Sequence, residues 1–181
     1  MAQQLADNTS VELELLPGFD ALPPFEENVS TFAENAAGKA LHYSRMSKGF
    51  VFADDSGLVV PALGDAPGVQ SARYAGVGAS SAERNTKLLR AMSSKHGIER
   101  QAHFVCAIAL AEAGHARAIV TGRVDGEILE GPRGQQGFGY DPLFFFPSLL
   151  KTFAELSAEE KNRYSHRGVA FRKLLAFLTT L

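Results

Sequence analysis

Apolar and polar residues alternate along the chain in patterns that predict several strands. Residues 11–15 alternate with a period of two, which favours a half-buried strand. Residues 102–111 and 117–126 predict two longer strands, and Gly114 between them indicates an antiparallel hairpin. Residues 140–147 predict a short, aromatic and buried strand.

Helices are predicted where a Ser or Thr is followed three residues later by Glu, the spacing of a capping box. This spacing occurs at residues 31–34, 80–83 and 157–160. The first helix would end at Gly49 and the second near Gly97, and Ser165 would open the last helix. Residues 1–10 are polar and predict at most a weak helix. This order of elements indicates an α/β protein built around one sheet. The apolar face of the first helix would consist of Phe32, Ala36, Ala40 and Tyr43.

Residues 50–60 are the stretch most suggestive of a ligand site. They predict an apolar strand that stops at Asp54 and Asp55, turns at Ser56-Gly57 and becomes apolar again. Polar groups at the carboxyl ends of strands commonly bind ligands in α/β proteins. Two acids there suit a hard divalent cation, which prefers oxygen ligands. An Asx turn with a purely backbone role is the alternative reading.

Composition limits the classes of protein to consider. The chain has 181 residues, 45% hydrophobic and 21% charged, which suits one globular domain. A net charge of −2 provides no basic field for a nucleic acid polymer. The single cysteine, Cys106, lies in an apolar run and predicts a buried thiol in a reducing compartment. The apolar run at 104–111 is too short to span a bilayer, and residues 1–4 do not resemble a signal peptide. We therefore expect no membrane association and a cytoplasmic location.

Three further groups are candidates for binding. Phe138 lies between two glycines, so its ring could stack on a planar base, although a core Phe in a turn has the same pattern. Lys161, His166 and Arg167 lie near a helix start, which favours anionic groups. His166 could equally be a capping or core histidine, and Lys39 a surface lysine that covers apolar atoms with its stem.

Other chemistries find no support in the sequence. The histidines show no metal-ligand spacing and there is no CxxC, which argues against a zinc site. The chain also has no Walker A loop, no GxSxG and no GxGxxG after a strand.

Read together, the motifs resemble the inosine triphosphate pyrophosphatase family, whose members hydrolyse non-standard purine nucleoside triphosphates. The resemblance extends from about residue 11 to the C-terminus, and five motifs in one order make a chance match improbable. The motifs are FAENAAGKA at 32–40, ADDSGL at 53–58, PGVQSARY at 67–74, GFGYDP at 137–142, and TFAEL at 152–156 with KN at 161–162 and SHRG at 165–168.

The resemblance implies an elongated single α/β domain over residues 1–181, with a long twisted mixed β-sheet flanked by helices, and a homodimer. It implies a Mg²⁺-dependent conversion of ITP, dITP or XTP to the monophosphate and pyrophosphate. Asp55 would be the catalytic base and a metal ligand, Glu27 the second acidic ligand, and Asp54 part of the same metal site. The remaining residues would bind the substrate. Ser56, Lys39 and Lys161 would face the phosphates, and Lys39 would also take part in catalysis. Phe138 would stack on the base, with Asp141, His166 and Arg167 at its edge, and Gly139 and Tyr140 would also bind the substrate.

The chemistry of Arg167 agrees with a keto-purine substrate. Its guanidinium only donates hydrogen bonds, so it can bond O6 of hypoxanthine or xanthine but faces the amino group of adenine. Buried donors left unpaired by adenine would discriminate strongly against ATP.

One feature departs from the family pattern. Members begin with a strand and a turn, [ST]-x-N-x-x-K, that grips the triphosphate, and this chain has no lysine before Lys39. We therefore expect a domain shortened at its N-terminus. A non-catalytic nucleotide-binding or interaction protein is the alternative, because a missing strand exposes a sheet edge that can pair with another chain. A pyrophosphatase for other modified or pyrimidine nucleotides is a further alternative.

Overall fold

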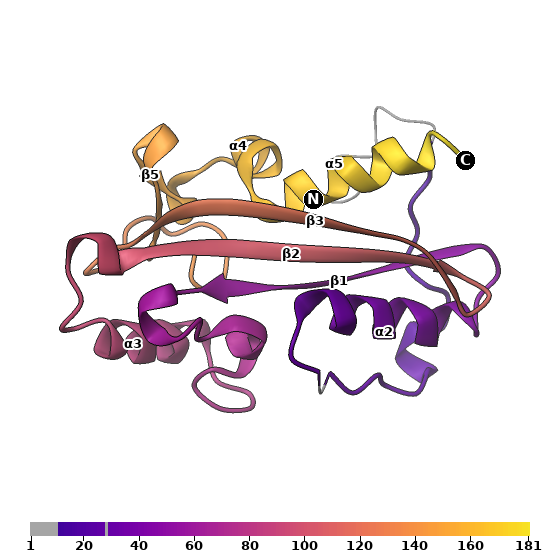
Figure 1. Cartoon of the computed structure of the whole chain (residues 1–181), viewed down its shortest axis with the longest axis horizontal. Coiled ribbons are helices and arrows are strands. Elements are labelled where there is room, and N and C mark those ends of the chain that lie inside the picture. The colour runs from indigo at the N-terminus through magenta and orange to yellow at the C-terminus, as the bar shows by residue number, and fades with distance from the viewer. Residues whose placement is uncertain (1–10, 28) are drawn as a thin grey trace. The chain divides into compact units, whose positions relative to one another are not determined.

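The computed structural model describes residues 11–27 and 29–181, and the weak helix expected over residues 1–10 lies outside these ranges (Figure 1). Short 3₁₀ turns connect several of the helices and strands. No helix within the described ranges is long and apolar enough to cross a membrane. The α-helices and strands are α2 (Phe32–Ser44), β1 (Phe50–Val59), α3 (Ser81–Ala91), β2 (Gln101–Glu112), β3 (His115–Ile128), β4 (Phe144–Phe146), β5 (Lys151–Thr152), α4 (Ala158–Tyr164) and α5 (His166–Leu178).

The strands form one sheet in the order β1-β2-β3-β4-β5. Ala113 and Gly114 join β2 to β3 with φ values of 49° and 79°, the left-handed conformation that a two-residue hairpin turn requires. This confirms the predicted hairpin. Strands β3 and β4 pair antiparallel, with Ile128 opposite Phe144, and β4 pairs antiparallel with β5. The α/β class predicted from the sequence is therefore correct.

The helix starts agree closely with the capping patterns. The Thr31 hydroxyl accepts a hydrogen bond from the Glu34 N–H at the start of α2, and Ser80 forms a complete capping box at α3. Helix α4 begins after Ser157 and α5 after Ser165, as predicted. Helix α2 ends at Ser44, before the predicted stop at Gly49, because the chain turns after Ser44 to reach β1.

Three strand predictions need correction. Residues 11–15 form no strand: Val11 and Leu13 pack against apolar side chains, but period-two burial does not require a paired backbone. The predicted turn at Ser56-Gly57 is also wrong, because β1 continues through it without interruption. The aromatic strand predicted over 140–147 is limited to Phe144–Phe146, because the backbone turns at Tyr140 with hydrogen bonds from the Leu143 and Phe144 N–H groups to its carbonyl.

The chain divides into two compact units. Unit 1 comprises the chain up to Ser56 with Cys106–Gly122 and Ser165–Leu181, and unit 2 comprises Gly57–Val105 with Arg123–Tyr164. In unit 1 the helices α2 and α5 lie on opposite faces of the strands (Figure 1). Because successive side chains of β2 point to opposite faces of the sheet, this strand packs against both helices. Cys106, Ile108 and Leu110 pack with α5, whereas Ala107, Ala109 and Ala111 pack with α2.

Unit 2 has a separate aromatic core. The rings of Phe104, Phe144 and Phe153 pack against one another there, with centroids 4.6 to 5.7 Å apart. Leu88 of α3 and Met92, the residue that follows this helix, are both fully buried and belong to the same cluster. The core holds the strand ends and the loop of residues 131–143 in unit 2.

Candidate functional site

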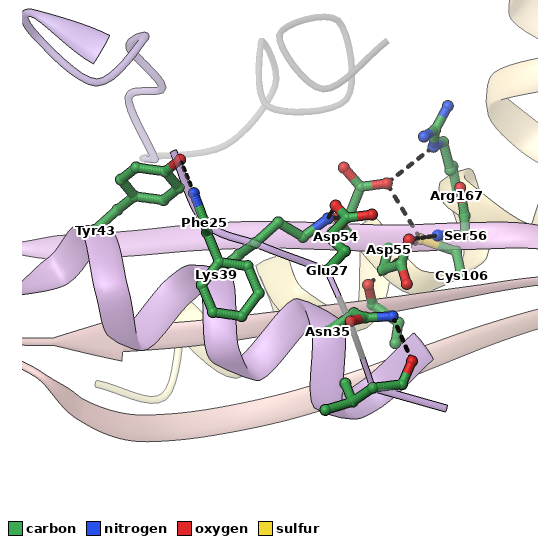
Figure 2. A network of polar contacts seen from close by, with 12 residues as sticks. Phe25, Glu27, Asn35, Lys39, Tyr43, Asp54, Asp55, Ser56, Cys106 and Arg167 are labelled. Carbon is green, nitrogen blue, oxygen red and sulfur yellow. Dashed lines mark hydrogen bonds and ion pairs between the residues drawn. The ribbon is translucent and has the colours of Figure 1, made fainter. Parts of the chain in front are cut away.

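The continuity of β1 places the two adjacent carboxylates on opposite faces of unit 1. Successive side chains of a strand point to opposite sides, so Asp54 and Asp55 cannot face the same way. The side chain of Asp54 meets Arg167 of α5, whereas Asp55 is influenced by Asn35 and Lys39 of α2 (Figure 2). The sequence predicted both acids at one cation, and the strand geometry separates them.

Asp55 has one satisfied and one unsatisfied oxygen. Its Oδ1 accepts the Ser56 N–H at 3.0 Å. Its Oδ2 is buried, and among the described residues it has no hydrogen-bond partner. Burial raises the pKa of Asp55, Glu27 adds to this, and Lys39 and Asn35 oppose it. A buried carboxylate oxygen without a donor is a suitable ligand for a cation.

Lys39 lies between the acidic groups of this face. Its Nζ donates to Glu27 Oε1 at 2.7 Å and to the Asp54 carbonyl oxygen at 2.5 Å. Its side chain is 18% exposed. The surface role considered from the sequence is therefore wrong, because the ammonium is bound by acceptors of the site (Figure 2).

On the other face, Asp54 binds Arg167. The Arg167 Nε donates to Asp54 Oδ2 at 3.0 Å, and the Cys106 thiol approaches the same oxygen at 3.9 Å. Burial, together with the negative charge of Asp54, raises the pKa of Cys106 to about 12, so the thiol stays protonated at neutral pH. Cys106 is buried, as its apolar surroundings in the sequence predicted.

In unit 2 the loop that carries Phe138 is held by a buried ion pair. Lys161 Nζ binds Asp141 Oδ2, and the same oxygen accepts the Phe138 N–H at 2.7 Å. Asp141 is 3% exposed, whereas Phe138 is 61% exposed. The Lys161 ammonium lies 4.8 Å from the centroid of the Phe138 ring, close enough for a cation–π contact. An exposed ring held in this way can serve as a stacking surface.

Gly137 allows this loop to be compact. Its φ of 78° is left-handed, and a Cβ there would collide with the Asp141 carboxylate and come within 2.8 Å of Lys161 Nζ.

Gly139 and Tyr140, which follow Phe138 and are also predicted to bind substrate, are hydrogen-bonded to other segments of unit 2. The Gly139 N–H donates to Ser81 Oγ at 3.2 Å, and the buried Tyr140 hydroxyl donates to the Ser71 carbonyl at 2.9 Å.

The remaining predicted residues belong to unit 1. His166 is buried at the first position of α5, beside Arg167, and Ser56 follows Asp55 in β1. A Cβ at Gly122 of β3 would collide with the His166 carbonyl, so glycine allows the start of α5 to approach the strand closely.

Sequence reasoning missed Asn35 as a residue of the site. Asn35 is 1% exposed, lies in the first turn of α2 and lowers the pKa of Asp55. A polar residue on the buried face of an amphipathic helix, next to Ala36, was the available signal.

The donor set suits a cation that takes few protein ligands. Within residues 11–27 and 29–181 no group of three or more His, Cys, Asp and Glu gathers as a metal site. Mg²⁺ usually takes one or two carboxylates and completes its shell with water and substrate phosphates. Glu27 fits that requirement, and so does Asp55, whose Oδ2 has no hydrogen-bond partner in the part of the chain that the structure describes. Asp54 is instead bound to Arg167.

Comparison with known proteins identifies close relatives. The sequence profile of the Ham1 family matches residues 1–177. A protein of Geobacillus kaustophilus named dITP/XTP pyrophosphatase is 51% identical over 164 residues, which cover 91% of this chain and 80% of the relative. A protein of Thermus thermophilus with the same name is 53% identical over 161 residues, 88% of this chain and 76% of the relative.

Solved structures agree with this relationship. A HAM1 protein from Coxiella burnetii has a TM-score of 0.91 at 44% identity, covering 99% of this chain and 92% of that chain. A structure from Mycobacterium abscessus, named nucleoside-triphosphatase / dITP/XTP pyrophosphatase, has a TM-score of 0.75 at 39% identity, covering 97% of this chain and 90% of that one.

Proposed function

We infer the function of this chain from the premise that it belongs to the Ham1 family. The chain is a nucleoside triphosphate pyrophosphatase that converts ITP, dITP or XTP to the monophosphate and pyrophosphate, and thereby removes non-standard purines from the nucleotide pool. The observation that carries this proposal is the cluster of Glu27, Lys39 and Asp55 in unit 1, which combines two carboxylates with one ammonium group. The names of the relatives support the same substrate class.

Asp55 is the proposed general base. Water attacks the α-phosphorus, the bond from that phosphorus to the bridging oxygen breaks, and pyrophosphate leaves with the bond electrons. Asp55 accepts the proton of the attacking water. Burial raises the pKa of Asp55 in the metal-free protein, so this carboxylate binds a proton more readily there than an ordinary aspartate does.

The cation is proposed to be Mg²⁺, held by Glu27 and Asp55. When bound, it supplies positive charge that offsets the phosphates and orients them. Lys39 and Ser56 bind the phosphate oxygens. We assign Asp54 to positioning Arg167 rather than to the cation, since its carboxylate already accepts from that guanidinium.

For the base we propose that Phe138 stacks on the purine and that Arg167 and His166 recognise its keto edge. Asp141 and Lys161 are bound to each other beneath Phe138, so we assign Lys161 to the base-binding part rather than to the phosphates. Gly139 and Tyr140 shape the same loop.

We further propose that residues 1–181 act as one catalytic domain, because β1, β2 and β3 each contain residues of both units. We also propose that the protein is a cytoplasmic homodimer and that it has no nucleic acid polymer as a partner. The alternative of a non-catalytic nucleotide-binding protein is not favoured, because Glu27, Lys39 and Asp55 retain an arrangement suited to hydrolysis.

Pyrophosphate release tests the proposal. With Mg²⁺ present, we expect turnover of ITP with a kcat/KM at least about 100-fold above that of ATP, the discrimination available to a polar site. Chelation by EDTA is expected to stop turnover, and added Mg²⁺ to restore it. Equal turnover of ITP and ATP, or none of either, would refute the proposal; rapid turnover of a modified pyrimidine nucleotide instead would favour the other pyrophosphatase class.

A further inference from the structure

Lys39 makes contacts that a phosphate-binding lysine does not require. Its ammonium donates to Glu27 Oε1 at 2.7 Å and to the Asp54 carbonyl at 2.5 Å, and it is largely shielded from water. These acceptors come from the loop before α2 and from β1, so Lys39 joins three separate segments of unit 1 (Figure 2). Its position in the third turn of α2 is fixed by the Thr31 cap and the buried alanine face of the helix.

The same cluster has more negative than positive charge. Glu27 and Asp55 each carry a carboxylate; the charge of Glu27 raises the pKa of Asp55, whereas the Lys39 ammonium lowers it and so favours the ionised form of Asp55. Asp55 Oδ2 has no hydrogen-bond donor among the described residues. Two neighbouring carboxylates, one of them with a buried and unpaired oxygen, are costly unless a cation compensates them.

We propose that Lys39 stands in for the divalent cation in the absence of substrate: its ammonium holds Glu27 beside Asp55, and the cation must displace it from Glu27. This inference rests on the proposed function, because it concerns the proposed ligands Glu27 and Asp55. The displaced ammonium is then available to the phosphates. Lys39 is thus a positioning residue for the cation ligands before it contacts substrate.

The proposal makes cation binding and phosphate binding depend on each other. A phosphate that attracts Lys39 releases Glu27 for the cation, and a cation at Glu27 releases Lys39 for phosphate. Such coupling is reciprocal by thermodynamic necessity. A lysine that only binds phosphate would not compete with the cation for Glu27 when no nucleotide is present, so cation affinity distinguishes the two roles.

Manganese binding without nucleotide tests the proposal by electron paramagnetic resonance of free Mn²⁺. We expect Lys39→Met to bind Mn²⁺ about threefold or more tightly than the wild type, as removal of a competing partly exposed ion pair should allow. Lys39→Arg keeps the charge and should not bind more tightly. Lys48→Met removes the same charge from an exposed position and controls for the change in net charge.

Glu27→Gln separates failure of this inference from failure of the proposed function. Weaker Mn²⁺ binding by Glu27→Gln together with tighter binding by Lys39→Met is the expected pair of results. If Glu27→Gln binds weakly but Lys39→Met binds no better than the wild type, the inference is overturned while the metal site stands. If Glu27→Gln binds as the wild type does, the metal site itself is wrong, and the inference with it. Should Lys39→Met fail to fold by circular dichroism, Lys39→Gln carries the same expectation.

Discussion

Asp55 is subject to two opposing demands, because the reaction needs its negative charge and burial disfavours that charge. Burial raises the pKa of Asp55 above its ordinary value. Protonation is therefore easier in the folded chain than in the unfolded chain. The stabilisation associated with this proton is present below the unfolded-state pKa and is lost as pH rises through the folded-state pKa.

Asp55→Asn should separate activity from stability. We expect turnover of ITP to fall by at least about 100-fold, the size of a general-base contribution. Without a divalent cation, the melting temperature should be above that of the wild type at neutral pH, because the amide carries no charge to desolvate. The advantage should shrink as pH falls from neutral towards the ordinary pKa range of aspartate, because the raised pKa makes the wild-type carboxyl take up its proton before an ordinary aspartate does.

Calorimetry across this pH range measures the stability difference, and pyrophosphate release measures the activity. Asp20→Asn, at an exposed position, is the matched control and should change neither quantity. An Asp55→Asn variant that melts below the wild type at every pH would contradict the expected direction of the stability change.

Gly137→Ala tests how the Phe138 loop is held. The new methyl group would collide with the Asp141 carboxylate, and the residue would keep a left-handed backbone. We expect KM for ITP to rise about tenfold, within the 1–3 kcal/mol that one stacked base contributes. Stability to urea should fall by about 1–3 kcal/mol because of the strained backbone.

Gly131→Ala is the control in the same loop, since its added Cβ meets no atom within 4 Å and its backbone is not left-handed. It should leave both KM and stability near the wild-type values. If the two alanine variants behave alike, the tight packing at Gly137 has no bearing on base binding.

At the scale of the elements, strand β1 assigns different tasks to two neighbouring carboxylates. Its alternation directs Asp55 to the α2 side and Asp54 to α5. Asp54 and Arg167 are 113 positions apart in the sequence, yet their side chains meet at 3.0 Å. The pairing orients a guanidinium whose donors suit a keto-purine.

Arg167→Ala should reduce the preference for ITP over ATP, measured as the ratio of kcat/KM values, by about tenfold or more, because a hydrogen-bonding site discriminates strongly. Asp54→Asn should also reduce this ratio of kcat/KM values, but by a smaller factor than Arg167→Ala does. The double variant should lose no more than Arg167→Ala alone, because the two side chains act as one unit.

Glu112→Gln serves as the control, since it breaks the exposed pair with Arg117 in the same unit and should leave the ratio unchanged. Additive losses in the double variant would show that Asp54 acts independently of Arg167. An unchanged ratio in Arg167→Ala would remove that residue from base recognition.

At the scale of the whole molecule, ligand binding should appear as added stability. IMP, the expected product, binds without being consumed. At a concentration about 100 times its Kd, it should stabilise the chain by about 2.7 kcal/mol, which raises the melting temperature by roughly 5–10 °C for a chain of this length.

AMP at the same concentration should raise the melting temperature much less. The difference between the two nucleotides should disappear in Arg167→Ala, because that variant lacks the donors that distinguish a keto group from an amino group. Differential scanning fluorimetry measures all four combinations. Equal stabilisation of the wild type by IMP and AMP would count against keto-purine recognition.

Some features of this protein follow from short stretches of sequence alone. The starts of α2, α3, α4 and α5 and the β2–β3 hairpin were predicted correctly, because a capping box or a two-residue turn is decided by hydrogen bonds among residues three or fewer positions apart. Family membership could also be predicted, since it is carried by ordered motifs that need no coordinates.

Other features were decided only by the tertiary structure. The strand predicted at residues 11–15 lacks a ladder because alternation specifies a buried face but not a partner. The turn predicted at Ser56 is absent because pairing within the sheet overrides a local turn preference. The partners of Lys39, Asp54 and Lys161 depend on contacts between segments far apart in the sequence, and only the packed chain determines which opposite charge each one meets.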